Sequence, residues 1–135
     1  MEGVVKAGRL GCWAVAIPVQ EASAVAWGDE RHVITNRAMY REKFIDAERI
    51  LGPVLPIRDS GYGFYLWVKT PIACDQFARE LFATQHITVL PGQYLGRTVD
   101  GHNPGAGYVR MALVAEPALC REALERIRTY LEGHL

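Results

Sequence analysis

The first half of the chain carries apolar residues at helical spacing in two successive segments. In residues 18–28 they recur every three or four positions, which predicts a helix that begins at Pro18 and ends near Gly28. A second, longer helix is predicted from Asp29, a suitable N-terminal cap, to about Leu51. The polar residues expected on the solvent side of this second helix are Arg31, Glu42, Lys43 and Asp46.

The second half of the chain mixes short strands with helices. Strands are predicted at Val54–Arg58 and Gly63–Val68. The latter contains consecutive large apolar residues, so both of its faces are expected to be covered. The remaining predicted elements are a helix at Asp75–Gln85, a strand at Ile87–Leu90, a strand at Tyr108–Val114 and a final helix that opens at Glu116-Pro117.

This order of elements predicts an α+β fold. Because strands and helices do not alternate strictly, the expected architecture is a two-layer α/β sandwich, with a mixed sheet of about four strands covered by helices. Residues 93–107 show neither the spacing of a helix nor the alternation of a strand, and they are rich in glycine. A loop of this length inside a compact domain often carries function.

The composition of the chain mainly excludes disorder and some classes of binding partner. Half of the 135 residues are hydrophobic, which is enough to bury a core and argues against disorder. Acidic and basic residues balance to a net charge of zero. Without a basic stripe or a run of like charge, neither nucleic acid nor a membrane surface is an expected partner.

The cysteines and histidines indicate neither a disulfide framework nor a metal site. Cys12, Cys74 and Cys120 form no CxxC pair, and no histidine has a zinc-type spacing to them. An odd number of cysteines without such pairs fits a reducing compartment. The expected location is therefore the cytoplasm.

Near the N-terminus, residues 10–19 have the outline of an export signal. Pro18 interrupts this apolar stretch, and Glu21 lies beside the cleavage-like Ala22–Ala24, so an export signal is not expected. No segment is long enough to span a bilayer.

Three features of the sequence can carry chemistry. Arg110 lies within an apolar strand, where a buried guanidinium needs a partner and can bind a carboxylate through two hydrogen bonds. The alternative is an arginine on the solvent face of an edge strand, which alternation explains without a ligand. The loop Val89–Gly96 is either a pocket wall or an ordinary turn, and the strand Tyr62–Trp67 either lines a substrate entrance or packs in the core.

Together and in this order, these features resemble the C-terminal small domain of class I/II aminotransferases, fold-type I enzymes that use pyridoxal phosphate (PLP). The resemblance is carried by GFYLWVKTP at 63–71, VLPGQYLGR at 89–97 and NPGAGYVRMALVA at 103–115. It is strongest to bacterial N-succinyldiaminopimelate aminotransferases. It covers about residues 17–135, whereas residues 1–16 form an unmatched N-terminal stretch.

The resemblance implies a substrate site. Arg110 matches the family's arginine that binds the substrate α-carboxylate, and Tyr62, Gly63 and Asn103 match further substrate-binding positions beside it. It also implies PLP as cofactor of the complete enzyme, an amino-acid or keto-acid substrate, and a place in lysine biosynthesis.

The groups that hold PLP in this family lie upstream of the matched part. None of the three lysines, Lys6, Lys43 and Lys69, corresponds to the cofactor lysine. No catalytic, cofactor-binding or metal-binding residue is therefore predicted, and the chain is expected to be inactive alone. Two origins fit this pattern: a truncated gene product that enters the family sequence near Ile17, or an internal start assigned within a complete gene.

Two other functions stay open. The chain can be a non-catalytic module that self-associates, as a homodimer or larger oligomer, or binds a partner through exposed apolar surface. It can also be a small regulator that binds an amino or keto acid at Arg110.

Overall fold

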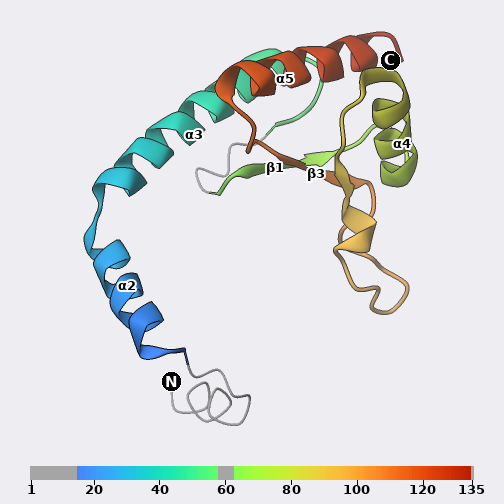
Figure 1. Cartoon of the computed structure of the whole chain (residues 1–135). Helices are drawn as coiled ribbons and strands as arrows, with labels where there is room; N and C mark the ends of the chain where they lie inside the picture. Colours follow the sequence, from blue (N-terminus) through green and yellow to red (C-terminus); the bar gives the residue numbers. More distant parts are fainter. Residues whose placement is uncertain (1–14, 58–62, 135) are drawn as a thin grey trace. The chain divides into compact units, whose positions relative to one another are not determined.

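The computed structural model describes residues 15–57 and 63–134 (Figure 1). The chain divides into two compact units, Met1–Arg37 and Ala38–Leu135. The long helix α3 begins in the first unit and ends in the second.

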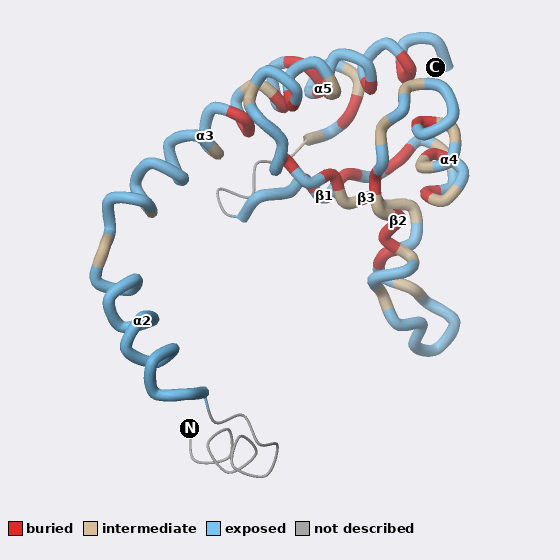
Figure 2. Tube along the Cα trace, viewed as in Figure 1, coloured by how far each residue is buried: buried red, intermediate tan, exposed pale blue. Residues whose placement is uncertain are grey.

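The first unit contains helix α2 (Ile17–Gly28), which confirms the first predicted helix. Pro18 stands in its first turn, where its missing N–H costs no helical hydrogen bond. No residue of α2 is buried (Figure 2). Its large apolar side chains are strongly exposed, with Val25 at 76% and Trp27 at 85%.

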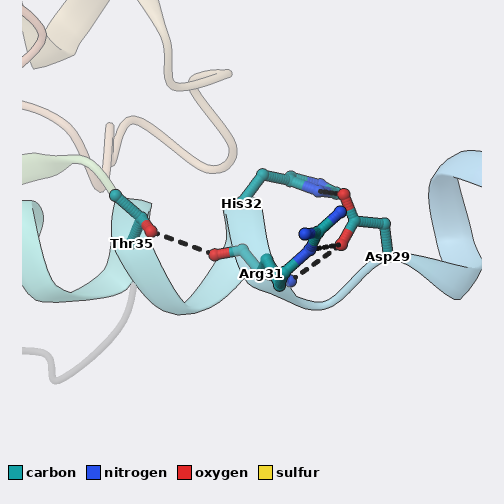
Figure 3. Close-up of polar contacts among 4 residues, drawn as sticks. All are labelled: Asp29, Arg31, His32 and Thr35. Carbon is teal, nitrogen blue, oxygen red and sulfur yellow. Dashed lines mark hydrogen bonds and ion pairs between the residues drawn. The ribbon is translucent and has the colours of Figure 1, made fainter.

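Asp29 organises the start of helix α3 (Arg31–Leu51), as the sequence predicts (Figure 3). Its carboxylate accepts a hydrogen bond from the backbone N–H of Arg31 at 3.1 Å. It also pairs with Arg31 Nε at 3.3 Å and His32 Nδ1 at 3.6 Å. The backbone and side-chain donors of Arg31 hold the pKa of the Asp29 carboxyl below its usual value.

The second unit packs three helices against a small sheet (Figure 1). The helices are the C-terminal half of α3, α4 (Cys74–Gln85) and α5 (Pro117–Glu132). The strands are β1 (Tyr65–Lys69), β2 (Leu90–Pro91) and β3 (Tyr108–Ala112), and a 3-10 turn, η1 (Gly92–Tyr94), follows β2. The α+β class is confirmed.

The sheet is simpler than the predicted mixed sheet of about four strands. Among the described residues it has three strands in the order β1-β3-β2, and both pairings are antiparallel. The predicted strand Val54–Arg58 is wrong over its described part, Val54–Ile57, which turns off the end of α3. Val54 and Leu55 both donate their N–H groups to Leu51 O, and Pro56 has no N–H for a strand ladder.

One face of the sheet is buried and the other is open. Leu66, Val68, Val109 and Met111 point into the core. On the other face Tyr65 and Trp67 are 39% and 41% exposed, so the prediction that both faces of β1 are covered is wrong for this chain. Alternation places every second side chain on the open face.

A single apolar cluster joins the helices to the buried sheet face. Its largest fully buried side chains include Phe77 and Leu81 from α4 and Leu131 from α5. Helices α4 and α5 therefore supply the centre of the core, and their apolar faces match the helical spacing of the sequence.

Lys43 departs from its predicted place on the solvent side of α3. It is only 8% exposed, and its ammonium donates to Leu113 O at 2.9 Å and Ala115 O at 2.7 Å. It also lies 4.9 Å from the ring centre of Tyr40. Because the side chain is long, it reaches the carbonyl oxygens that follow β3 from a helix position that the sequence pattern marks as polar.

Helices α4 and α5 are also joined by a polar contact. The Tyr130 hydroxyl donates to the Glu80 carboxylate, which accepts a second hydrogen bond from Gln76 at 2.8 Å. The hydroxyl of Tyr130 and the amide of Gln76 lower the pKa of Glu80. Burial and the neighbouring carboxylate raise the pKa of Tyr130 to about 12.

Replacing Tyr130 with phenylalanine is expected to flatten the pH dependence of stability at both ends. The lowered pKa of Glu80 stabilises the fold above its unfolded value of 4.5, and this contribution is lost as the pH falls through the folded pKa. The raised pKa of Tyr130 stabilises the fold below pH 10.0, and this contribution is lost as the pH rises toward about 12. Denaturant unfolding of Y130F and the parent between about pH 3 and pH 11 measures both effects.

The exposed Tyr94 provides the matched control. Y94F is expected to leave the pH profile of stability unchanged. Parallel profiles for Y130F and the parent would contradict the role given to the Tyr130–Glu80 contact.

Candidate functional site

The open face of the sheet centres on Arg110. Strand β3 lies between its two neighbours, and Arg110 is in register with Trp67 of β1 and Leu90 of β2. Its guanidinium carbon lies 5.7 Å from the ring centre of Tyr65. Arg110 is therefore on a solvent face, but of the central strand and not of an edge strand.

Arg110 is half-buried and keeps its donors free of carboxylates within the described ranges 15–57 and 63–134. Several other arginines of the same unit are paired; Asp46, for example, accepts hydrogen bonds from Arg49 and Arg121, both at 2.8 Å. These two donors lower the pKa of Asp46. The guanidinium of Arg110 can therefore offer a planar pair of donors to an external carboxylate.

Two aromatic side chains of β1, Tyr65 and Trp67, share the open face with Arg110 and form its aromatic frame. Trp67, the cross-strand neighbour of Arg110, stacks on Tyr108 with ring centres 5.8 Å apart and planes inclined by 9°. Tyr65 is a diagonal cross-strand neighbour of Arg110, and its ring lies against the guanidinium. An apolar frame around a cation reduces its hydration, which strengthens its attraction for an anion.

Two glycine turns meet beside this face. A Cβ on Gly105 would lie 2.0 Å from Gly92 O, and a Cβ on Gly92 would lie 2.5 Å from Gly105 O and 2.7 Å from the Trp67 ring. The backbones at the two positions are thus in direct contact, which only glycine allows. The turn after β2 and the turn before β3 form one packed corner.

Asn103 ties this corner together. Its side-chain amide donates to Gln93 O at 3.0 Å and Gly96 O at 3.3 Å, and its side-chain oxygen accepts the N–H of Gly105 at 2.9 Å. All of these contacts are to the backbone of the two turns.

The long loop 93–107 contains a small hairpin that the sequence analysis missed. Val99 and His102 exchange both backbone hydrogen bonds at 2.9 Å. Asp100 and Gly101 form its tip, with φ of 51° and 77°. An Asp-Gly pair is the usual signal of such a turn and was present in the sequence.

The predicted substrate-binding residues do not all meet. Gly63 lies just before β1, with φ of +93°, near the end of β3 where Phe64 O accepts the N–H of Leu113 at 2.8 Å. Asn103 lies at the other end of β3, before Tyr108. Arg110 stands between them, and Tyr62 lies outside the described residues.

The two described lysines do not fit a PLP site. The amine of Lys43 is buried and held by two carbonyl oxygens. Lys69 is exposed at the end of β1, opposite Tyr108, and no described carboxylate is bonded to it. A PLP site needs a lysine together with an acid for the ring nitrogen and donors for the phosphate. Lys6, the third lysine, lies outside the described residues.

A hollow of about 360 Å³ lies elsewhere on the second unit, between α4 and η1. Its walls include Phe82, Pro91 and Tyr94 and the ion pair between Asp75 and Arg79. Arg110 is not among its walls. The hydrogen bond from Arg79 lowers the pKa of Asp75.

The described residues contain neither a metal-binding cluster nor a membrane-spanning helix. No cluster of three or more histidine, cysteine or acidic side chains in this part of the chain can hold a metal ion. No helix within it combines the length and apolar character needed to cross a bilayer.

Comparison with known proteins relates the chain to aminotransferases. No protein-family model matches it. It is 31% identical over 120 residues to an LL-diaminopimelate aminotransferase of Syntrophobacter fumaroxidans, which covers 78% of this chain and 28% of that protein. A crystal structure of an aminotransferase from Neisseria meningitidis superposes with a TM-score of 0.81 and 47% identity, covering 87% of this chain and 30% of that one.

A third relative is also described as an aminotransferase. A structure described as a probable N-succinyldiaminopimelate aminotransferase from Thermus thermophilus matches with a TM-score of 0.56 and 30% identity, covering 67% of this chain and 23% of that one. The chain spans less than a third of the length of these relatives. Over the part that it spans, the chain is a homologue of aminotransferases, as its sequence motifs predicted.

Proposed function

We propose that this chain serves as the small-domain part of a PLP-dependent amino-acid aminotransferase, and that Arg110 binds the substrate α-carboxylate there. The proposed reaction is the transfer of an amino group from N-succinyl-LL-2,6-diaminopimelate to 2-oxoglutarate, a step of lysine biosynthesis. Every compound in this exchange carries carboxylates, which an arginine fork recognises.

The observation that supports the proposal best is the placement of Arg110. Its guanidinium is half-buried on the open sheet face, framed by Tyr65 and Trp67, without a carboxylate partner in the described ranges. A half-buried guanidinium without a carboxylate partner in the described fold is suited to bind an external carboxylate. The homology to aminotransferases supplies the reaction class.

The remaining chemistry is assigned to parts of the relatives that this chain does not span. PLP would supply the electron sink for amino transfer, and the described lysines are not placed to bind it. The contribution of this chain is therefore to fix the substrate in position, which lowers the barrier by orientation. These 135 residues alone are expected to show no transamination.

A chimaera tests the proposal. The aligned 30% of the Neisseria meningitidis aminotransferase is replaced by residues 17–135 of this chain. The chimaera is expected to transaminate, and R110A within it is expected to raise KM for the amino donor about ten- to hundredfold, the value of a charge-assisted hydrogen-bonded pair. Steady-state kinetics with PLP and 2-oxoglutarate measures this change.

Arg97, an exposed arginine of the long loop, provides the matched control. R97A is expected to leave KM unchanged. If R110A matched R97A in an active chimaera, Arg110 would not be the carboxylate ligand. A folded chimaera that binds PLP but does not transaminate would contradict the assignment of the chain to this enzyme class.

The exposed helix α2 favours one alternative, a non-catalytic module that self-associates. Ile17, Val25 and Trp27 are each at least 70% exposed, which is unusual for large apolar side chains of a monomer. Sedimentation velocity of the chain alone separates the two functions. A tight dimer together with an inactive chimaera would favour the self-associating module.

A further inference from the structure

One side chain, Asn103, connects the two turns beside the sheet. Both of its amide hydrogens have backbone acceptors, Gln93 O and Gly96 O, and its oxygen accepts the N–H of Gly105. Its principal donor and acceptor groups are thus engaged within the loop. The fit is tight, because a Cβ on Gly96 would lie 2.3 Å from the Asn103 oxygen.

The corner that Asn103 holds touches the aromatic frame of Arg110. Gly92 and Gly105 are in backbone contact, and the ring of Trp67 packs against Gly92. Trp67 is in turn the cross-strand neighbour of Arg110. A continuous path of contacts therefore leads from the Asn103 amide, through the two glycines, to the indole of Trp67, the cross-strand neighbour of Arg110.

We infer that Asn103 is a positioning residue, which fixes Trp67 beside Arg110 by locking the two turns together, and does not itself bind substrate. The meaning of this frame for substrate rests on the proposed function of Arg110, but the lock itself is a property of the chain alone. Without the Asn103 amide, the turn at Gln93–Gly96 loses its link to the turn before β3. The Trp67 ring then loses its fixed support at Gly92.

Fluorescence of Trp67 tests this inference in the full chain. The chain contains three tryptophans, so W13F and W27F leave Trp67 as the only tryptophan, and excitation beyond the tyrosine absorption band selects its emission. In this background N103A is expected to shift the emission maximum to longer wavelength and to increase quenching by acrylamide. N103D is expected to do the same, because it keeps the acceptor for Gly105 N–H but loses both donors.

Y130F separates positioning from a general loss of stability. It breaks a contact between α4 and α5, away from the two turns, and is expected to leave Trp67 emission unchanged. All variants are measured at a temperature where circular dichroism shows them folded. If N103A does not fold, the measurement is made on N103D alone.

A double-mutant cycle with Gly96 gives a second readout. G96A is expected to lower the denaturation midpoint in the parent, and to lower it less in N103A, because the obstructing oxygen is then absent. Unchanged Trp67 emission in folded N103A and N103D, or additive effects in the cycle, would overturn the inference. The chimaera can fail while this test succeeds, and the reverse, so the two proposals are distinguishable.

Discussion

Replacing Gly105 with alanine is expected to lower the free energy of unfolding by about 3 kcal/mol, the upper part of the usual range for overpacking. The added Cβ would lie 2.0 Å from Gly92 O and 3.1 Å from Gln93 N, so the obstacles are backbone atoms. A flexible side chain could rotate away, whereas here the whole turn after β2 must shift. Denaturant unfolding followed by circular dichroism measures the loss.

Gly133 offers the same chemical change without the clash. A Cβ at this position would meet its nearest atoms at 3.5 Å, an ordinary contact, in the same unit of the fold. G133A is therefore expected to keep the stability of the parent or to raise it slightly. A G105A variant as stable as G133A would show that the two turns are not packed as described.

Replacing Lys43 with methionine is expected to cost about 2 to 4 kcal/mol of stability, because the buried carbonyl oxygen of Leu113 and the partly buried one of Ala115 each lose a charged donor. Methionine keeps the length and most of the apolar contacts of the side chain, so the change isolates the ammonium. The affected oxygens, on Leu113 and Ala115, lie where the chain leaves β3 for α5. The loss is measured by denaturant unfolding, and a lower protection of the β3–α5 junction in hydrogen exchange should accompany it.

Lys69 is the matched control for this experiment. It is exposed at the end of β1, and K69M is expected to change stability by no more than about 0.5 kcal/mol. If K43M were as stable as K69M, the ammonium of Lys43 would contribute nothing that a thioether cannot replace.

The helices could be predicted because apolar residues recur at helical spacing over segments of many residues. Helices α2, α3, α4 and α5 begin and end within a few residues of the predicted positions, and Asp29 caps α3 as expected. Short strands carry less information. The predicted strand Ile87–Leu90 is confirmed only at Leu90, because the strand that pairs with β3 is Leu90–Pro91.

The wrong predictions for β1 and Lys43 have physical causes that cannot be seen in a single sequence. The run of aromatic residues in β1 predicted cover on both faces, but Tyr65 and Trp67 remain 39% and 41% exposed in the described chain. The prediction put Lys43 on the solvent side because a helical pattern assigns charged residues to the exposed face. Its acceptors are 70 and 72 residues away in the sequence, so no local pattern could reveal them.

The candidate site was predictable only in part. Strand alternation alone left Arg110 undecided, and the resemblance to aminotransferases singled it out. The register that places Trp67 beside it, and the contact between Gly92 and Gly105, are tertiary features. The hydrogen bonds of Asn103 to the backbone of the two turns are likewise tertiary features that the sequence does not reveal.

The small hairpin at Val99–His102 has a practical consequence. All four of its residues are exposed, and its closing pair is held by two reciprocal backbone hydrogen bonds. Such a tip tolerates inserted residues, because the bonds on either side keep the flanking chain in place. A peptide tag or a fluorophore inserted between Asp100 and Gly101 would mark this protein without touching either its core or the face that carries Arg110.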